Sequence, residues 1–267
     1  MIKLIATDMD GTFLDSNKQF AWQFLDTYQR LKAHGIRFVI ASGNQYQRLY
    51  QRFLPMSHDF VFISENGSFI VDGEKELYAN VIAPDTLKRL NQILAPYTSI
   101  YMVYSGKKAA YLKNISEAFD EVVNMHYCAV EHVRTVEEID DEIFKVAVYD
   151  PEEHIERFLE EISEQLPPDL KVVTSGNMWM DIQNKSINKG IAIRFLQEKW
   201  HLKPEECMAF GDQMNDYEML QTVGHAYAMA NAVEPIKAIA KYHCPDNEHQ
   251  GVVQTIEQYL NDLESES

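Results

Sequence analysis

Two acidic residues separated by one position follow the first apolar segment of the chain. Asp8 and Asp10 lie just beyond residues 2–6, which the β-branched content predicts to be a buried strand. Carboxylates this close repel each other, and either a cation or protonation of one of them relieves the repulsion. A plain Asp-Gly-Thr turn is the alternative interpretation, because Asp and Gly are common in turns.

Further acidic residues follow a later apolar segment. Asp212 and Asp216 come after residues 207–210, which again read as a buried strand. Together with Asp8 and Asp10 they offer only carboxylate oxygens, and neither His nor Cys joins them. Such a set of ligands favours Mg²⁺ over zinc. Asp216 could also be the N-cap of a helix, a role compatible with orienting the metal ligands.

Several residues predict contacts to a phosphate group. Ser42 supplies a hydroxyl group, and the backbone amides near Met9 and Gly43 supply hydrogen-bond donors. Lys189, at the start of a predicted helix, adds a positive charge. Taken alone, Ser42 could be a turn residue and Lys189 a solvated charge.

These groups together predict a two-step phosphoryl transfer. Asp8 would attack phosphorus and form an aspartyl phosphate. Asp10 would give a proton to the departing alcohol and later take one from the water that hydrolyses the intermediate. Lys189 would offset charge on the phosphate oxygens, while Asn215 or Asp216 would orient the metal ligands.

Alternating apolar segments predict how these residues are positioned. Strand and helix patterns follow each other with short connections from residue 2 to residue 64 and resume at Lys189. This rhythm predicts an α/β fold with a doubly wound parallel sheet. In such a sheet the carboxyl ends of neighbouring strands meet at one edge, where Asp8, Ser42 and Asp212 would converge.

Between these two halves the pattern changes. Residues 82–185 mix strand pairs with helices and predict an inserted α+β domain with an antiparallel sheet. Residues 1–81 and 186–267 would then form the catalytic core, with the insert acting as a cap.

Composition limits the partners. The 267 residues carry a formal charge of −17, which argues against nucleic acid or an anionic membrane and leaves a small phosphorylated substrate. Three widely spaced cysteines indicate neither a disulfide framework nor a zinc site. With no signal peptide and no apolar segment long enough for a membrane span, we expect a cytoplasmic monomer or small homo-oligomer.

Four motifs in order resemble those of the haloacid dehalogenase superfamily of phosphatases, with its Rossmann-like core. They are Asp8–Thr12, Ala41–Asn44, Asn188–Gly190 and Gly211–Asp216. Ser64–Gly67 and the stretch from Asp246 to Val252 are similar to the Cof-type branch, and the first two motifs to its bacterial sugar phosphatases. Glu65 and Asn66 could simply form a hairpin turn, an interpretation that we favour over a contact to the substrate.

The resemblance implies a role for each matching residue. Asp8 would be the nucleophile and Asp10 the acid/base, with the Asp10 backbone carbonyl binding the metal. Ser42 and Lys189 would contact phosphate. Asp212 would be a metal ligand, and Asn215 would hold phosphate or metal.

The resulting hypothesis is a Mg²⁺-dependent phosphatase acting on phosphorylated sugars, a phosphoric monoester hydrolase. A phosphotransferase or mutase would use the same residues. A phosphate-sensing regulator is a third possibility, but Asp10 argues against it because a long-lived aspartyl phosphate gains nothing from a neighbouring proton shuttle.

Overall fold

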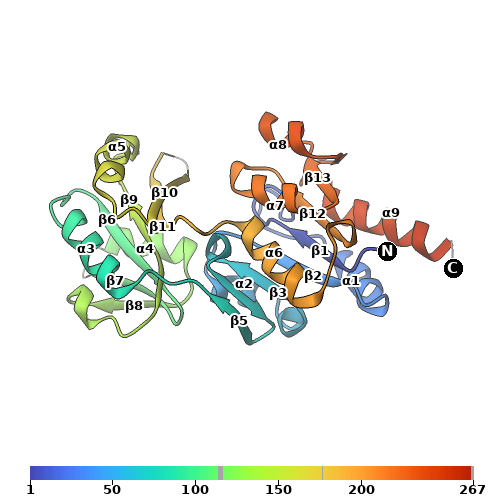
Figure 1. Ribbon diagram of the computed structural model, residues 1–267, viewed down its shortest axis with the longest axis horizontal. Helices are drawn as coiled ribbons and strands as arrows, with labels where there is room; N and C mark the ends of the chain where they lie inside the picture. Colours follow the sequence, from blue (N-terminus) through green and yellow to red (C-terminus); the bar gives the residue numbers. More distant parts are fainter. Residues whose placement is uncertain (114–116, 176, 266–267) are drawn as a thin grey trace. The chain divides into compact units, whose positions relative to one another are not determined.

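The computed structural model describes residues 1–113, 117–175 and 177–265 (Figure 1). The chain divides into two compact units. Unit 1 contains residues 1–43 and 52–77 and the chain from residue 188 onward, whereas unit 2 contains residues 44–51 and 78–187. That unit 1 is a catalytic core and unit 2 a cap stays a prediction.

Unit 1 is built on an eight-stranded sheet with the order β14-β13-β12-β1-β2-β3-β4-β5. The pairs from β14 to β3 are parallel, and β4 is antiparallel to β3. This arrangement confirms the predicted α/β fold with a doubly wound sheet. The strands are β1 (Leu4–Thr7), β2 (Arg37–Ala41), β3 (Val61–Ser64), β4 (Phe69–Asp72), β5 (Lys75–Ala79), β12 (Cys207–Gly211), β13 (His225–Met229) and β14 (Tyr242–Cys244).

Helices connect the parallel strands of this sheet. They are α1 (Phe24–Ala33), α2 (Tyr46–Arg52), α6 (Lys189–Trp200), α7 (Tyr217–Thr222), α8 (Glu234–Ile239) and α9 (Gly251–Ser265), with short 3₁₀ turns at Met56–Asp59, Glu65–Gly67, Pro204–Glu206 and Met214–Asp216. Every residue of β1, β3 and β12 is buried, which explains why these strands are continuous apolar segments instead of alternating ones.

The register of the central strands sets the level of the predicted site. Thr7 of β1 lies opposite Ile40 of β2 and Phe210 of β12. The loops after these three neighbouring strands therefore begin within about one residue of the same level. Asp8, Ser42 and Asp212 belong to these loops.

Unit 2 has a six-stranded sheet with the order β10-β11-β9-β6-β7-β8, in which only β7 and β8 pair in parallel. Its elements are α3 (Pro84–Leu94), β6 (Tyr101–Gly106), β7 (Ala110–Lys113), α4 (Glu117–His126), β8 (Val130–Val133), a 3₁₀ turn (Val136–Glu138), β9 (Ile143–Tyr149), α5 (Glu156–Gln165), β10 (Leu170–Ser175) and β11 (Trp179–Asn184). Along β9, Val146 and Val148 belong to one apolar cluster, and Ala147 and Tyr149 to a second one. Side chains alternate along a strand, so the sheet packs apolar residues on both faces.

Two features differ from the sequence-based expectation. Helix α2, expected within the doubly wound layer, groups largely with unit 2, and the Gln45 side chain just before it bonds to the backbone of Cys128 and Ala129. The strand β14 was not predicted, because three residues give no apolar pattern to detect. Among the described residues, no helix is long and apolar enough to cross a membrane.

Candidate active site

The loop after β1 forms a tight turn around Met9. The Asp8 amide donates to the Phe210 carbonyl at 3.1 Å, which joins the ends of β1 and β12. The Met9 carbonyl accepts from the amides of residues 12, 13 and 14, and the Met9 side chain is buried. Gly11 has a φ of +81°, and a Cβ atom there would lie 2.5 Å from Asp212 Oδ2. Only glycine fits this turn.

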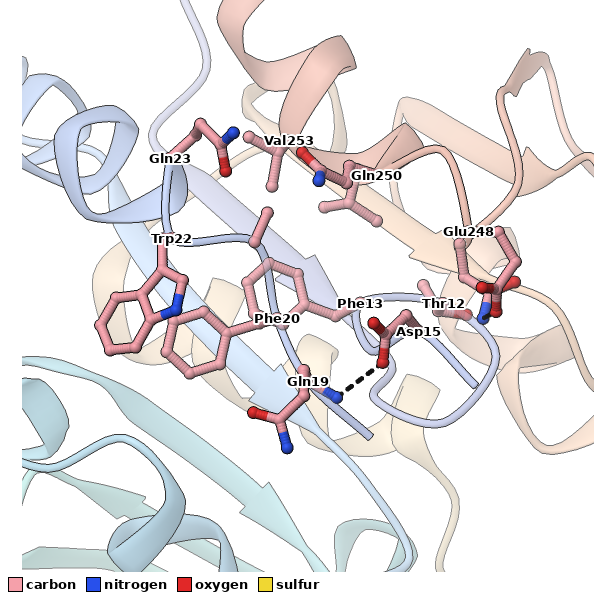
Figure 2. A pocket seen from close by; sticks show the side chains of 13 residues that line it. Thr12, Phe13, Asp15, Gln19, Phe20, Trp22, Gln23, Glu248, Gln250 and Val253 are labelled. Atoms are coloured by element: carbon pink, nitrogen blue, oxygen red, sulfur yellow. Dashed lines mark hydrogen bonds between the residues drawn. The ribbon is translucent and has the colours of Figure 1, made fainter. Parts of the chain in front are cut away.

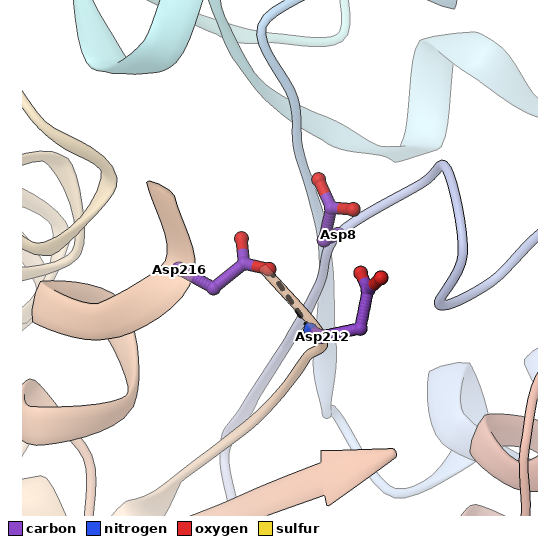
Figure 3. A group of neighbouring side chains, drawn as sticks. All are labelled: Asp8, Asp212 and Asp216. Carbon is purple, nitrogen blue, oxygen red and sulfur yellow. Dashed lines mark hydrogen bonds between the residues drawn. The ribbon is translucent and has the colours of Figure 1, made fainter. Parts of the chain in front are cut away.

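Three carboxylates converge beside this turn (Figure 3). One oxygen from each of Asp8, Asp212 and Asp216 lies within 4.8 Å of the others. All three residues are buried, with Asp8 only 6% exposed. The structure therefore brings together two of the predicted metal ligands and Asp216, which was predicted to support them.

Lys189 bridges two members of this cluster. Its Nζ atom donates to Asp8 Oδ1 at 2.5 Å and to Asp216 Oδ1 at 2.6 Å, and the side chain is fully buried. The Asn188 side chain caps α6 by accepting from the Ile191 amide at 2.8 Å, which fixes the start of the helix that carries the lysine. Lys189 is thus a positioned charge and not a solvated one.

Asp216 has a structural position in the cluster. Its Oδ1 atom accepts from Lys189, and its Oδ2 atom accepts from the amides of Asp212 at 3.0 Å and Gln213 at 3.2 Å. Both oxygens are engaged, so Asp216 holds the β12 loop and Lys189 in place. Lys189 contacts one oxygen of Asp8, and Thr12 Oγ1 donates to one oxygen of Asp212 at 2.8 Å.

Thr12 was not singled out from the sequence as a site residue. Its position at the end of the first motif was the available signal, but its partner lies 200 residues away in sequence. Only the pairing of β1 with β12 brings the two residues together.

Burial and charge shift the ionisation of the cluster. Burial, and then the negative charge of Asp216, raise the pKa of Asp8 well above its usual value, with Lys189 acting in the opposite direction. Burial is also the largest cause that raises the pKa of Asp212 to about 6. Burial alone would lower the pKa of Lys189, but Asp216 and Asp8 raise it, so the lysine stays charged.

The cluster fits a divalent cation. Three buried carboxylates face a single lysine, so the group carries excess negative charge in a place that solvates charge poorly. Its donor atoms are all oxygen, as Mg²⁺ prefers. Asp8 and Asp212 are the residues that would hold the ion, because both Asp216 oxygens are already engaged.

Asp10 lies apart from this buried cluster. Its Oδ1 atom forms an ion pair with Lys18 Nζ at 2.7 Å, and its side chain is 47% exposed. The structure does not bring the Asp10 carboxylate together with the other predicted acidic ligands. Asn215 is also exposed, in the 3₁₀ turn before α7. The roles predicted for these two residues stay predictions.

Ser42 and Gly43 follow β2 next to the turn after β3. Ser42 is buried, its amide donates to the Ile63 carbonyl at 2.8 Å, and its carbonyl accepts from the Asn66 amide at 3.0 Å. Gly43 is partly buried. The predicted phosphate-binding loop is therefore fixed to the neighbouring strand.

Unit 1 also contains a pocket between the residues that follow β1 and the start of α9 (Figure 2). Aromatic side chains of Phe13, Phe20 and Trp22 and the aliphatic Val253 line it, with polar groups such as Asp15 around them. None of the residues predicted for catalysis lines this pocket.

Comparison with known proteins identifies the family. The family model of haloacid dehalogenase-like hydrolases matches residues 5–256. The 5-amino-6-(5-phospho-D-ribitylamino)uracil phosphatase YbjI of Escherichia coli is 34% identical over 261 residues, covering 97% of this chain and 96% of that protein. A phosphatase of Bacillus subtilis with the same substrate in its name, YitU, is 25% identical and covers 97% of both chains.

A solved structure agrees with these relatives. The crystal structure of a Streptococcus mutans protein superposes with a TM-score of 0.87 at 31% identity, covering 98% of this chain and 100% of that one. The superfamily predicted from the four motifs is confirmed. The chain belongs to the haloacid dehalogenase-like hydrolases, and within that family it is a phosphatase.

Proposed function

We propose that this phosphatase depends on Mg²⁺ and hydrolyses phosphate monoesters of sugars or of similar polyhydroxylated alcohols through a phosphorylated Asp8. The observation that carries the proposal is the buried contact between Asp8 and Lys189 beside Asp212 and Asp216. A nucleophilic carboxylate must be ionised in a buried place, and Lys189 favours the ionised form.

In the first step, one oxygen of Asp8 forms a bond to phosphorus while the bond from phosphorus to the ester oxygen breaks. The departing alcohol takes a proton from Asp10. In the second step, water attacks the phosphorus of the aspartyl phosphate, its proton returns to Asp10, and inorganic phosphate leaves with Asp8 restored. The Asp10 carboxyl group is 47% exposed and pairs with Lys18, so it would leave this ion pair to give its proton to the alcohol.

The remaining residues bind and orient. Ser42 and the amides near Met9 and Gly43 would donate to the phosphate oxygens, since the loops after β1 and β2 begin at nearly the same level. Lys189 compensates negative charge during both steps, and Asn215 would bind phosphate or support the metal. Mg²⁺, held by Asp8, Asp212 and the Asp10 backbone carbonyl, would neutralise charge on the phosphoryl group.

The proposed substrate class follows from the relatives. Two of them are named for 5-amino-6-(5-phospho-D-ribitylamino)uracil, a phosphate monoester at the end of a ribityl chain. We infer the same kind of leaving group here, either a sugar or a sugar alcohol, and a cytoplasmic location that suits such metabolites. The inserted unit 2 would act as the cap that selects this leaving group.

A panel of phosphate monoesters tests the proposal. Wild-type protein is expected to release phosphate from ribitol 5-phosphate, from sugar phosphates and from an aryl phosphate over many turnovers with Mg²⁺, and to stop when EDTA is added. Asp8→Asn should lower phosphate release about 10⁴-fold or more. Asp26→Asn, an exposed residue on α1, serves as the control.

Four outcomes would contradict the proposal. Asp8→Asn protein that still turns over would exclude Asp8 as the nucleophile, and unchanged activity in EDTA would exclude the metal. A single burst without turnover would favour the phosphate-sensing regulator, whereas transfer of phosphate to an added sugar in preference to water would favour a mutase.

A further inference from the structure

The turn between β3 and β4 has an unusual backbone. Glu65, Asn66 and Gly67 have consecutive φ values of +49°, +56° and +108°. Residues other than glycine rarely adopt such values, because a Cβ atom strains the backbone there. Glu65 is 1% exposed and Asn66 is 9% exposed, so the hairpin turn between the antiparallel strands β3 and β4 is buried.

Contacts on two sides hold this turn in place. On one side the Asn66 amide donates to the Ser42 carbonyl at 3.0 Å. On the other side Gly67 lies against the start of α6, because a Cβ atom there would be 2.6 Å from the Asn188 carbonyl oxygen. The turn therefore contacts both the Ser42 loop and the residue that precedes Lys189.

The Asn66 carboxamide lies directly over Gly43. Its Oδ1 and Nδ2 atoms are 3.0 and 3.2 Å from the position that a Cβ atom of Gly43 would occupy. Oδ1 is buried, and within the described part of the chain it has no hydrogen-bond partner. A buried acceptor without a donor lowers the stability of the fold, so a strained backbone here holds an acceptor that the protein itself does not satisfy.

The chemistry of an acceptor limits what can complete it. A phosphate dianion offers only acceptor oxygens, so it cannot satisfy Asn66 Oδ1. A hydroxyl or N–H group of the leaving alcohol can. Because Oδ1 lies beside Gly43 of the proposed phosphate-binding loop, that donor must be close to the phosphate ester.

We propose that Asn66 binds the substrate, with Oδ1 accepting a hydrogen bond from a hydroxyl group next to the phosphorylated carbon. This inference rests on the proposed function and deepens it, because it assigns a specificity-determining residue in unit 1. The left-handed turn would hold the Asn66 acceptor in its binding position before the substrate binds, which lowers the entropy cost of binding.

The test compares two esters with Asn66→Gly. Ribitol 5-phosphate carries a hydroxyl group next to the phosphorylated carbon, whereas phenyl phosphate has no hydrogen-bond donor in its leaving group. Glycine accepts the left-handed φ without strain, so this variant removes the carboxamide and keeps the backbone. We expect kcat/KM for ribitol 5-phosphate to fall about 10-fold or more, and kcat/KM for phenyl phosphate to change less than about 3-fold.

Two further variants separate binding from structure. Asn66→Asp keeps an acceptor and tolerates the left-handed backbone, so the ratio of kcat/KM for the two esters should stay near the wild-type ratio although the added charge lowers both values. His201→Gly removes a side chain at another left-handed position, the C-terminal end of α6, and should change neither value.

If Asn66→Gly lowers kcat/KM equally for both esters, or lowers neither value, Asn66 does not recognise the leaving group and the inference is overturned. If Asn66→Gly does not fold, Asn66→Asp decides. A fall of about 10-fold in its ratio of kcat/KM for ribitol 5-phosphate to kcat/KM for phenyl phosphate would contradict an acceptor role for Asn66. The activity of wild-type protein on both esters is measured first. If it releases no phosphate from either ester, the proposed function is refuted.

Discussion

Single residues determine the charge balance of the site. Lys189 is the only cation of the described residues that contacts the cluster of Asp8, Asp212 and Asp216. Three carboxylates are buried with a single ammonium group, so the cluster has a deficit of positive charge. Burial and the neighbouring carboxylates accordingly raise the pKa values of Asp8 and Asp212. A bound divalent cation would remove this deficit.

Asp212 links metal binding to pH. Its folded-state pKa of about 6 is above the ordinary value, so in metal-free protein its contribution to stability is present at low pH and is lost as pH rises through about 6. Mg²⁺ competes with the proton for this carboxylate. We expect 10 mM Mg²⁺ to raise Tm by about 3 °C or more at pH 7.5 and by much less at pH 5.

Differential scanning fluorimetry measures this shift directly. Asp212→Asn should abolish the Mg²⁺ shift at pH 7.5, and Asp26→Asn should retain it. A shift of the same size at both pH values would contradict the account of Asp212.

Sequence patterns anticipate part of this residue-scale picture. Asp8 and Asp212 could be predicted to meet, because the end of a parallel strand fixes where its next residue lies. The pairing of Asp10 with Lys18, and the engagement of both Asp216 oxygens, could not be predicted. They depend on loop conformations that leave no periodic pattern in the sequence.

At the scale of elements, the start of α6 determines where Lys189 lies. A Cβ atom on Gly190 would be 2.5 Å from the Glu218 carbonyl oxygen, so α6 and α7 approach each other closely at this point. The same helix start contacts Gly67. Two close backbone contacts and the Asn188 cap thus place the lysine within a narrow range.

Gly190→Ala tests this packing. The added methyl group should push α6 away from α7, lower the unfolding free energy by about 1–3 kcal/mol and lower kcat about 10-fold or more, because Lys189 moves with its helix. Urea unfolding and steady-state kinetics measure the two effects.

Gly35→Ala is the matched control for that variant. Gly35 has a φ of +67° but nothing within 4 Å of a Cβ atom, so alanine there should cost stability through backbone strain alone and leave kcat unchanged. Normal kcat in Gly190→Ala protein would show that this contact does not position Lys189.

The apolar segments predicted the buried strands of unit 1 well, because strands buried on both faces are continuous in sequence. The grouping of α2 with unit 2 could not be predicted in this way. It rests on contacts such as Gln45 with the backbone of Ala129, which join residues more than 80 positions apart.

At the scale of the whole molecule, the insert has a hydrophobic core of its own. The two apolar clusters of unit 2 lie entirely between Ile82 and Ile182. A segment that buries its own apolar residues is expected to fold independently. The change from alternating strands and helices to strand pairs mixed with helices predicts the insert. Its exact limits depend on contacts between residues far apart in the sequence.

Residues 80–187 expressed alone should therefore fold. We expect a single cooperative thermal transition with β-sheet circular dichroism, and Val146→Asp, which places a charge at a fully buried position of β9, should abolish it. A fragment without any cooperative transition would contradict an independently folded cap.

In the proposed reaction, Asp8 becomes phosphorylated during turnover. Borohydride reduces an aspartyl phosphate to homoserine, so quenching the enzyme with borohydride during turnover, followed by peptide mass spectrometry, reads the site directly. We expect homoserine at position 8, dependent on substrate and absent from Asp8→Asn protein. Steady phosphate release with no homoserine at position 8, or with homoserine at another aspartate, would contradict it.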